Sequence, residues 1–134
     1  MMYYDVDESK GVLNMQVELT RFRVKKGKEE LTDQWMEFLN KHMNDALLTL
    51  DGEKMFVETI MRDSMGDYEY LYWYSIQADD GDSNSETEKC IDTKHLEYFD
   101  KCIDRTYRPK NLKTEVVMIP QRIKKQIEAA AEEV

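Results

Sequence analysis

Apolar residues recur in this chain with two different periods, and the order of these periods constrains the fold more than any other feature. Alternation of apolar and polar residues predicts strands, whereas recurrence every three or four residues predicts helices. The predicted elements are a strand over 15–24, a helix over 31–46, strands over 54–62 and 68–77, a helix over 91–102, a strand over 112–119 and a helix over 121–133.

Two segments of the chain resemble each other. MEFLNKHM at 36–43 aligns without gaps with LEYFDKCI at 96–103, an offset of 60 residues. The same offset brings Phe56-Val57 onto Val116-Val117, so each helix is followed by its strand at the same distance. Two similar β-α-β halves predict an α+β fold, a ferredoxin-like β-α-β-β-α-β sandwich with both helices on one face of a four-stranded antiparallel sheet.

The predicted strands carry two further signals. In the first strand the apolar positions change phase after Leu19, which is compatible with a β-bulge. The segment DSMGD at 63–67 has the Asp and Gly of a hairpin connection, so the second and third strands are expected to pair antiparallel.

One face of such a sheet is left without helices. The third strand places Tyr70, Tyr72 and Tyr74 on one side and Leu71 and Trp73 on the other, so neither side has the composition of a solvated surface. We expect the three tyrosines to form a dimer face in a sheet-to-sheet homodimer. The alternative is that the C-terminal helix covers this face.

The length and cysteine content indicate a single intracellular domain. We expect a flexible N-terminal arm over 1–13 and one domain over 14–134 that includes the C-terminal helix. The first residues do not resemble a secretory signal, and no apolar run approaches the roughly 20 residues that span a bilayer. Cys90 and Cys102 fall on one predicted helix roughly 18 Å apart, too far for a disulfide, which favours a cytoplasmic location.

The charge of the chain excludes several classes of partner. With 19 basic and 28 acidic residues, the formal net charge is −9. Such a field repels phosphate backbones and anionic headgroups, so we expect no nucleic-acid partner and no membrane partner.

The two histidines occupy notable positions on the predicted helices. At 100° per residue, His42 and His95 each lie on the apolar face of a helix and should point toward the sheet. With Trp35, Trp73 and Tyr98 they are the candidate residues of a cavity between helices and sheet, in which one imidazole could serve as general acid or base. The competing interpretation is that both histidines are core or interface residues bonded to a hydroxyl or a carbonyl.

Other polar groups suggest weaker candidates. The tyrosines of the third strand could line a ligand cavity, although Tyr and Trp are also common in strands and at dimer interfaces. Arg21 and Arg23 could bind an acidic ligand, but pairing with Glu58 or Glu69 on neighbouring strands is the favoured interpretation.

No established cofactor signature is present. An acidic segment has oxygen ligands at the first, third and fifth places of a calcium loop, Asp80, Asp82 and Asn84, but Ser85 and Ile91 replace its essential Gly and Glu. The motifs CxxC, HExxH, GxGxxG, GxxxxGK[ST] and GxSxG are also missing. We therefore expect no metal and no cofactor.

The blocks VELTRFRVKKGKEE, EKMFVETIMR, YLYWYSIQ, KHLEYFDKCID and KTEVVMIP resemble a small bacterial family of unknown function, over about residues 14–125. This family is similar to the dimeric α+β barrel superfamily, which includes antibiotic-biosynthesis monooxygenases. The resemblance implies a ferredoxin-like protomer, sheet-to-sheet dimerisation and a cytoplasmic bacterial setting. It transfers no catalytic residues.

Three functional hypotheses follow. The first is a homodimeric protein that binds a small molecule in the helix-to-sheet cavity. The second is a cofactor-free enzyme of the monooxygenase or isomerase type, in which a histidine acts with a tyrosine or Arg21. The third is a protein-interaction module that uses the open tyrosine face and is a monomer on its own.

Overall fold

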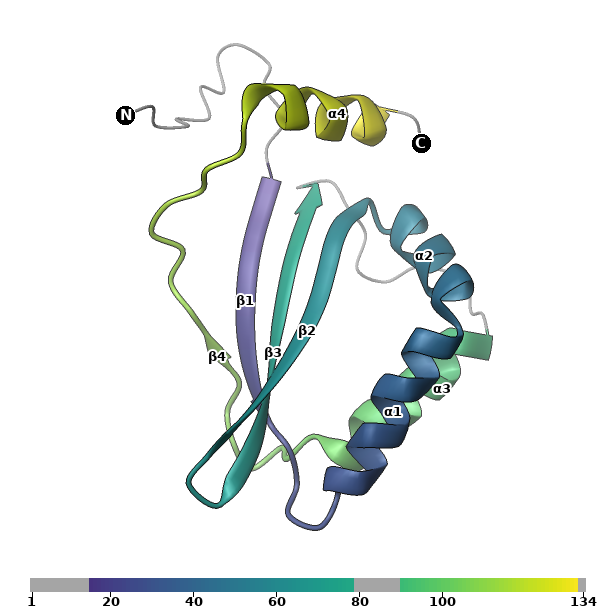
Figure 1. Ribbon diagram of the computed structural model, residues 1–134, viewed down its shortest axis with the longest axis vertical. Helices are drawn as coiled ribbons and strands as arrows, with labels where there is room; N and C mark the ends of the chain where they lie inside the picture. Colours follow the sequence, from purple (N-terminus) through teal and green to yellow (C-terminus); the bar gives the residue numbers. More distant parts are fainter. Residues whose placement is uncertain (1–14, 79–89, 133–134) are drawn as a thin grey trace.

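The computed structural model describes residues 15–78 and 90–132, which contain four helices and four strands (Figure 1). These elements are β1 Met15–Arg23, α1 Glu29–Lys41, α2 Met43–Gly52, β2 Met55–Met65, β3 Tyr68–Ala78, α3 Cys90–Cys102, β4 Lys110–Asn111 and α4 Gln121–Glu132. The predicted α+β class is confirmed.

The strands form an antiparallel sheet in the order β2-β3-β1-β4. This order is consistent with the ferredoxin-like arrangement that the alternating periods predict, because the first strand lies between the third and the fourth. The helices α1 and α3 lie side by side on one side of the sheet (Figure 1).

The face of the sheet under the helices, here called the helix face, carries alternate residues of each strand. Trp73 of β3 lies between Thr20 of β1 and Ile60 of β2. The ring of Trp73 contacts that of Trp35 on α1, with centroids 5.8 Å apart. The helices therefore cover the side of β3 that carries Leu71 and Trp73, which the sequence left undetermined.

The opposite side, here called the open face, carries Tyr70, Tyr72 and Tyr74 of β3. Tyr72 lies between Arg21 of β1 and Met61 of β2. The helix α4 crosses the upper end of the strands and does not lie along this face (Figure 1). The apolar residues of β1 thus change phase because Leu19 faces the open side and Phe22 the helix side.

The core lies where α1, α3 and the lower half of the sheet meet. It is formed by the buried residues Val24, Trp35, Leu71, Cys102 and Ile103. Full burial of an aliphatic side chain such as that of Val24, Leu71 or Ile103 stabilises a fold by about 1.5–3 kcal/mol. The contact between Val24 and Ile103 fastens the end of β1 to the end of α3, and Lys25 N–H donates to the carbonyl of Cys102 at 2.7 Å.

The hairpin between β2 and β3 is confirmed and is longer than predicted. The strands continue to Met65 and Tyr68, and Gly66 takes a φ of +65° in the two-residue turn, a conformation that favours glycine. The predicted β-bulge in the first strand is wrong, because β1 pairs with β3 in continuous register. The irregularity lies instead in β2, between Met55 and Val57.

The first predicted helix is interrupted at His42. The backbone there has φ −109° and ψ 34°, and the chain continues as α2. The Nδ1 atom of His42 lies 3.0 Å from the carbonyl oxygen of Phe38, which also accepts the backbone N–H of His42. The break redirects α2, so that it contacts β2 while α1 remains packed on α3.

The position predicted for the last strand is wrong. β4 comprises only Lys110–Asn111, while residues 112–119 run beside β1 with few backbone bonds. Leu112 N–H donates to the carbonyl of Leu19, and farther along the hydroxyl of Thr114 donates to the carbonyl of Val17. A regular β-ladder is made of backbone N–H to carbonyl bonds between the two strands. Here the carbonyl of Val17 accepts the side-chain hydroxyl of Thr114.

Candidate functional site

A cavity of about 400 Å³ lies between α1, α2 and the edge strand β2. We call it the main cavity. Its apolar lining consists of Met36 and Leu39 of α1, Met43, Ala46, Leu47 and Leu50 of α2, and Ile60 of β2. Its polar lining includes Asn40, Thr49, Glu53, Glu58 and His95.

The course of the helices explains why a cavity forms here. Trp35 fills the space between α1 and the sheet at the lower end, where it is fully buried. Beyond the break at His42 the chain offers smaller or more exposed side chains, such as Ala46 and the half-exposed Leu47. The helix layer therefore leaves the upper part of the helix face unfilled next to β2.

Glu58 is the acidic side chain of β2 that lines this cavity. It is half-buried, and burial raises the pKa of its carboxyl above the ordinary value. A hydrogen bond with the indole of Trp73 partly offsets this rise, because the indole N–H donates to the ionised form. The cavity therefore holds a carboxyl group that is largely withdrawn from water.

His95 of α3 is held at the inner end of the same cavity. The indole Nε1–H of Trp35 donates to its Nδ1 at 3.0 Å. Since Nδ1 accepts this bond, a neutral His95 carries its proton on Nε2. The imidazole packs against the rings of both Trp35 and Trp73, with centroids 5.6 and 5.7 Å away, and the two indoles also contact each other.

His95 also reaches a second, more open cavity of about 290 Å³, which Trp73, Phe22 and Phe99 help to line. Glu18 borders this second cavity. In the sheet, Glu18 and Glu58 lie on either side of Ser75. The two cavities thus flank one histidine and each has one carboxyl group from the sheet.

The internal sequence repeat brings equivalent residues into contact. Trp35 and His95 are 60 residues apart in sequence and are hydrogen-bonded. Phe38 and Tyr98 are separated by the same offset, and their ring centroids lie 5.6 Å apart. Residues at equivalent positions of the two similar helices therefore contact each other where α1 packs on α3. These contacts were not predicted from the sequence.

Four of the five predicted cavity residues gather in one aromatic cluster, namely Trp35, Trp73, His95 and Tyr98. Of these, His95 lines the main cavity, while Trp35 belongs to the core. The prediction that His42 points toward the sheet is wrong. His42 is exposed at the helix break, where its ring packs at a tilt against that of Phe38 with centroids 4.5 Å apart.

The predicted pairing of Arg21 and Arg23 with Glu58 or Glu69 is also wrong. Both arginines lie on the open face, where Arg21 donates to the hydroxyl of Tyr107 at 2.8 Å and Arg23 pairs with Asp104 at 2.9 Å. The candidate dimer-face residues Tyr70, Tyr72 and Tyr74 share that face.

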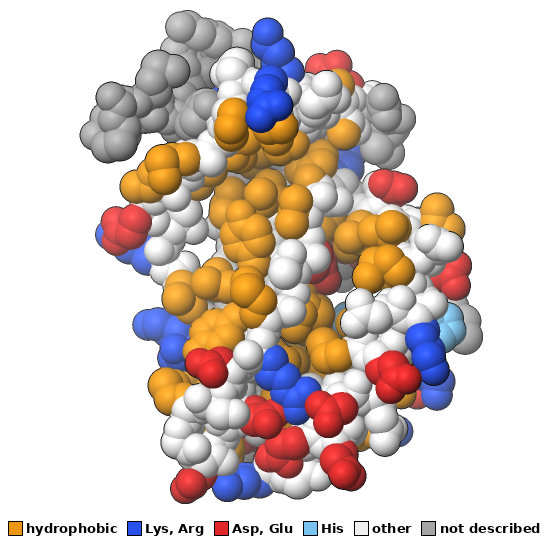
Figure 2. Space-filling model, in the orientation of Figure 1, with side chains coloured by type: hydrophobic (Ala, Val, Ile, Leu, Met, Phe, Trp, Pro, Cys, Tyr) orange, Lys and Arg blue, Asp and Glu red, His pale blue; other side chains and the backbone are white. Residues whose placement is uncertain are grey.

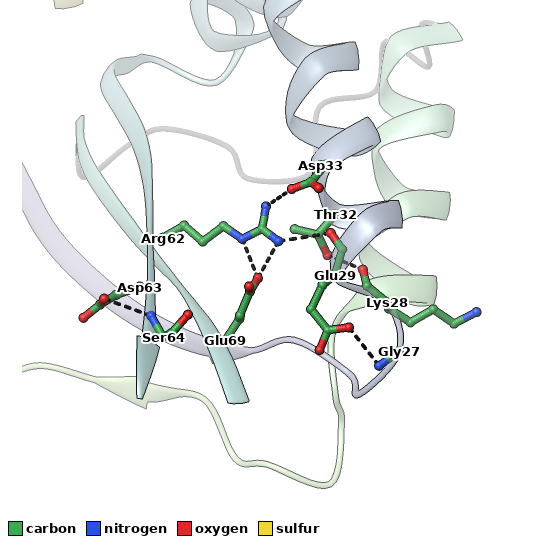
Figure 3. A network of polar contacts seen from close by, with 9 residues as sticks. All are labelled: Gly27, Lys28, Glu29, Thr32, Asp33, Arg62, Asp63, Ser64 and Glu69. Carbon is green, nitrogen blue, oxygen red and sulfur yellow. Dashed lines mark hydrogen bonds and ion pairs between the residues drawn. The ribbon is translucent and has the colours of Figure 1, made fainter. Parts of the chain in front are cut away.

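On the helix face, Glu69 pairs instead with Arg62 (Figure 3). Glu58 has Trp73 as its partner, and sequence reasoning missed its place in the cavity. The signal was available, since Glu58 occupies the same side of its strand as Ile60.

The acidic segment considered as a calcium loop lies mostly outside the described residues, which end at 78 and resume at 90. Across 15–78 and 90–132, no group of three or more His, Cys, Asp or Glu side chains is placed to hold a metal ion. Over the same ranges, no helix has the length and apolar content needed to cross a membrane.

Comparison with protein families identifies the family of this chain. The model of a family described as a family of unknown function (DUF6176) matches residues 15–125. This range includes β1 to β4 and every residue that lines the main cavity. A search of curated proteins finds no match.

Proposed function

The chain belongs to this family of unknown function, DUF6176, and we propose that it binds a small, largely apolar molecule in the main cavity. The observation that carries the proposal is the cavity itself. Its volume of about 400 Å³ lies within the roughly 300–1,000 Å³ of small-molecule sites.

The lining has the composition expected of a ligand site. Most of its side chains are aliphatic or methionine, and methionine adapts its shape to irregular ligands. A few polar groups converge on the same space, above all the carboxyl of Glu58 and the imidazole of His95. Such an arrangement uses apolar contacts for affinity and the polar groups for orientation.

We propose that the protein works as a homodimer joined through the open face, as in the dimeric α+β barrels that its sequence resembles. Figure 2 shows hydrophobic side chains gathered over the strands, with charged side chains concentrated toward the lower end. Met61 on this face is 52% exposed, and Val116 and Met118 of the neighbouring segment are 61% and 70% exposed. A second copy would cover all three, because a two-fold axis brings the same face of each protomer together.

We place the protein in the cytoplasm. The buried Cys102 is a free thiol, which fits a reducing compartment.

Filling the cavity tests the proposed binding. The neutral fluorescent probe N-phenyl-1-naphthylamine is expected to bind the wild type saturably, with the emission increase of an apolar site. The substitution Ala46→Phe places a ring in the cavity and is expected to weaken binding by about ten-fold or more, the equivalent of 1.4 kcal/mol. Leu50→Trp fills the same space from the next turn of α2 and provides a second variant.

The matched control is Ala129→Phe, which adds the same ring at an exposed position of α4. It should leave probe affinity within about two-fold of the wild type, since it lies outside the cavity. Probe binding that survives both cavity-filling variants, each shown by circular dichroism to be folded, would contradict the proposal.

A second candidate function is proton transfer on a bound molecule, because His95 and Glu58 line the same cavity. The version that used Arg21 is wrong, because Arg21 lies on the other side of the sheet. An enzyme would convert its ligand and lose turnover in His95→Asn while retaining binding. A binding protein would release the ligand unchanged.

A further inference from the structure

We infer that the natural ligand of the main cavity is a hydrophobic amine whose cationic group binds the carboxylate of Glu58. This inference rests on the proposed binding function and assigns its ligand class.

The charges around the cavity favour a cation. Its lining contains two carboxyl groups, of Glu53 and Glu58, and its described lining residues include no lysine and no arginine. The Nδ1 atom of His95, which also lines the cavity, already accepts the indole N–H of Trp35. An anionic ligand would meet the carboxylate of Glu58 and, among the described lining residues, no lysine or arginine to pair with.

Glu58 is placed to bind a ligand rather than another side chain. The Trp73 indole bonds its carboxyl, and among the described residues no ion pair reaches it. A carboxylate offers about four acceptor positions, so one indole donor leaves capacity for a further donor. Charged groups withdrawn from water are normally paired, and an ammonium ion in the cavity would supply the missing partner.

The apolar part of the lining determines the body of the ligand. Opposite Glu58, the walls are the aliphatic and thioether side chains of Leu39, Met43, Leu47 and Leu50. They provide apolar contacts without further donors or acceptors. The complementary molecule therefore has a hydrocarbon body and one amino group at the end that reaches β2.

Three probes with one hydrocarbon chain separate charge from hydrophobicity, namely octylamine, 1-octanol and octanoate. Calorimetric titration at pH 8 is expected to give an affinity for octylamine about ten-fold or more above that for 1-octanol, as for a hydrogen bond to a charged group. Octanoate should bind most weakly. In Glu58→Gln, octylamine and 1-octanol should bind equally well.

The matched control is Glu18→Gln, which removes one negative charge on the other side of Ser75 and outside the main cavity. It should keep the preference for octylamine. Equal binding of octylamine and 1-octanol by the wild type would overturn the inferred ligand class and leave the proposed cavity binding standing. If none of the three probes binds, both the ligand class and the proposed binding function fail.

Discussion

At the scale of single residues, the position of Glu58 illustrates how a sheet exposes a charged side chain to a cavity. Its strand neighbours Val57 and Thr59 point to the open face, so Glu58 must point under the helices. There it meets the Trp73 indole instead of water. The carboxyl thus loses part of its hydration on folding.

Substitution of Glu58 should change the dependence of stability on pH. Its pKa is raised in the folded protein, so folding favours the protonated form, and this contribution is lost as pH rises from the ordinary value of 4.5 through the raised value. Glu58→Gln is therefore expected to be more stable than the wild type at pH 8, with a difference that shrinks toward pH 4.5. Urea unfolding across this range measures it.

The other ionisable groups near Glu58 are Glu53, His95 and Glu18. They are present in both the wild type and Glu58→Gln, so their titration does not account for a difference between the two profiles. Glu18→Gln, at an exposed carboxyl, should follow the wild-type profile. A Glu58→Gln profile parallel to that of the wild type at all pH values would show that burial does not perturb this group.

At the scale of secondary-structure elements, Arg62 joins the β2–β3 hairpin to the start of α1 (Figure 3). Its guanidinium donates to Glu69 of β3 at 2.7 Å, to Asp33 of α1 at 2.5 Å and to the carbonyl of Glu29 at 3.0 Å. The bonds of Arg62 to Asp33 and to the Glu29 carbonyl hold the start of α1 against the sheet. The main cavity lies toward the other end of α1, where the helix layer continues as α2.

Removal of this attachment should cost stability. Arg62→Met keeps the apolar stem and is expected to lower the free energy of unfolding by about 1–3 kcal/mol, because it leaves the half-buried Glu69 without its charged partner. A double-mutant cycle with Glu69→Gln should give a coupling of about 0.5–3 kcal/mol. Arg105→Met removes the exposed pair with Asp100 and should cost at most about 1 kcal/mol. Equal effects of the two arginine substitutions would contradict the proposed role of Arg62.

At the scale of the whole molecule, the apolar character of the open face is the main unexplained feature of a lone protomer. In the part of the chain that the structure describes, α1 and α3 cover one side of the sheet and no helix lies along the other. Residues 112–119 lie beside β1 without completing a long fourth strand. Their exposed side chains, Val116 and Met118, continue the apolar surface of the sheet. Sheet-to-sheet pairing would bury this surface.

Sedimentation velocity should show a dimer of the wild-type chain. Met61→Asp and Met118→Asp place a charge in the proposed interface and are expected to weaken dimerisation by about thirty-fold or more each, the equivalent of a 2 kcal/mol hot spot. Leu96→Asp changes a residue of α3 that is 61% exposed and should leave the dimer intact. A folded wild-type monomer would contradict the dimer and favour the interaction module.

Much of the fold could be predicted because its signals are local. Alternation over β3 predicted a strand and its two faces, and the spacing of Tyr98, Phe99 and Cys102 predicted one side of α3. The site was less predictable. Trp35, Trp73, His95 and Tyr98 were expected near one another and are so. The lining from α2 was missed, because the break at His42 directs α2 toward the edge strand β2 and no local pattern predicts that contact.

The periodicity of apolar residues was sufficient for the α+β class and for the antiparallel hairpin, since side-chain direction along a helix or strand depends on the local backbone alone. Packing between distant segments decided the rest, namely which face the helices cover, where residues 112–119 lie, and that Glu58 and His95 share a cavity. These features depend on contacts between residues far apart in the chain, and no local pattern encodes the distance between them.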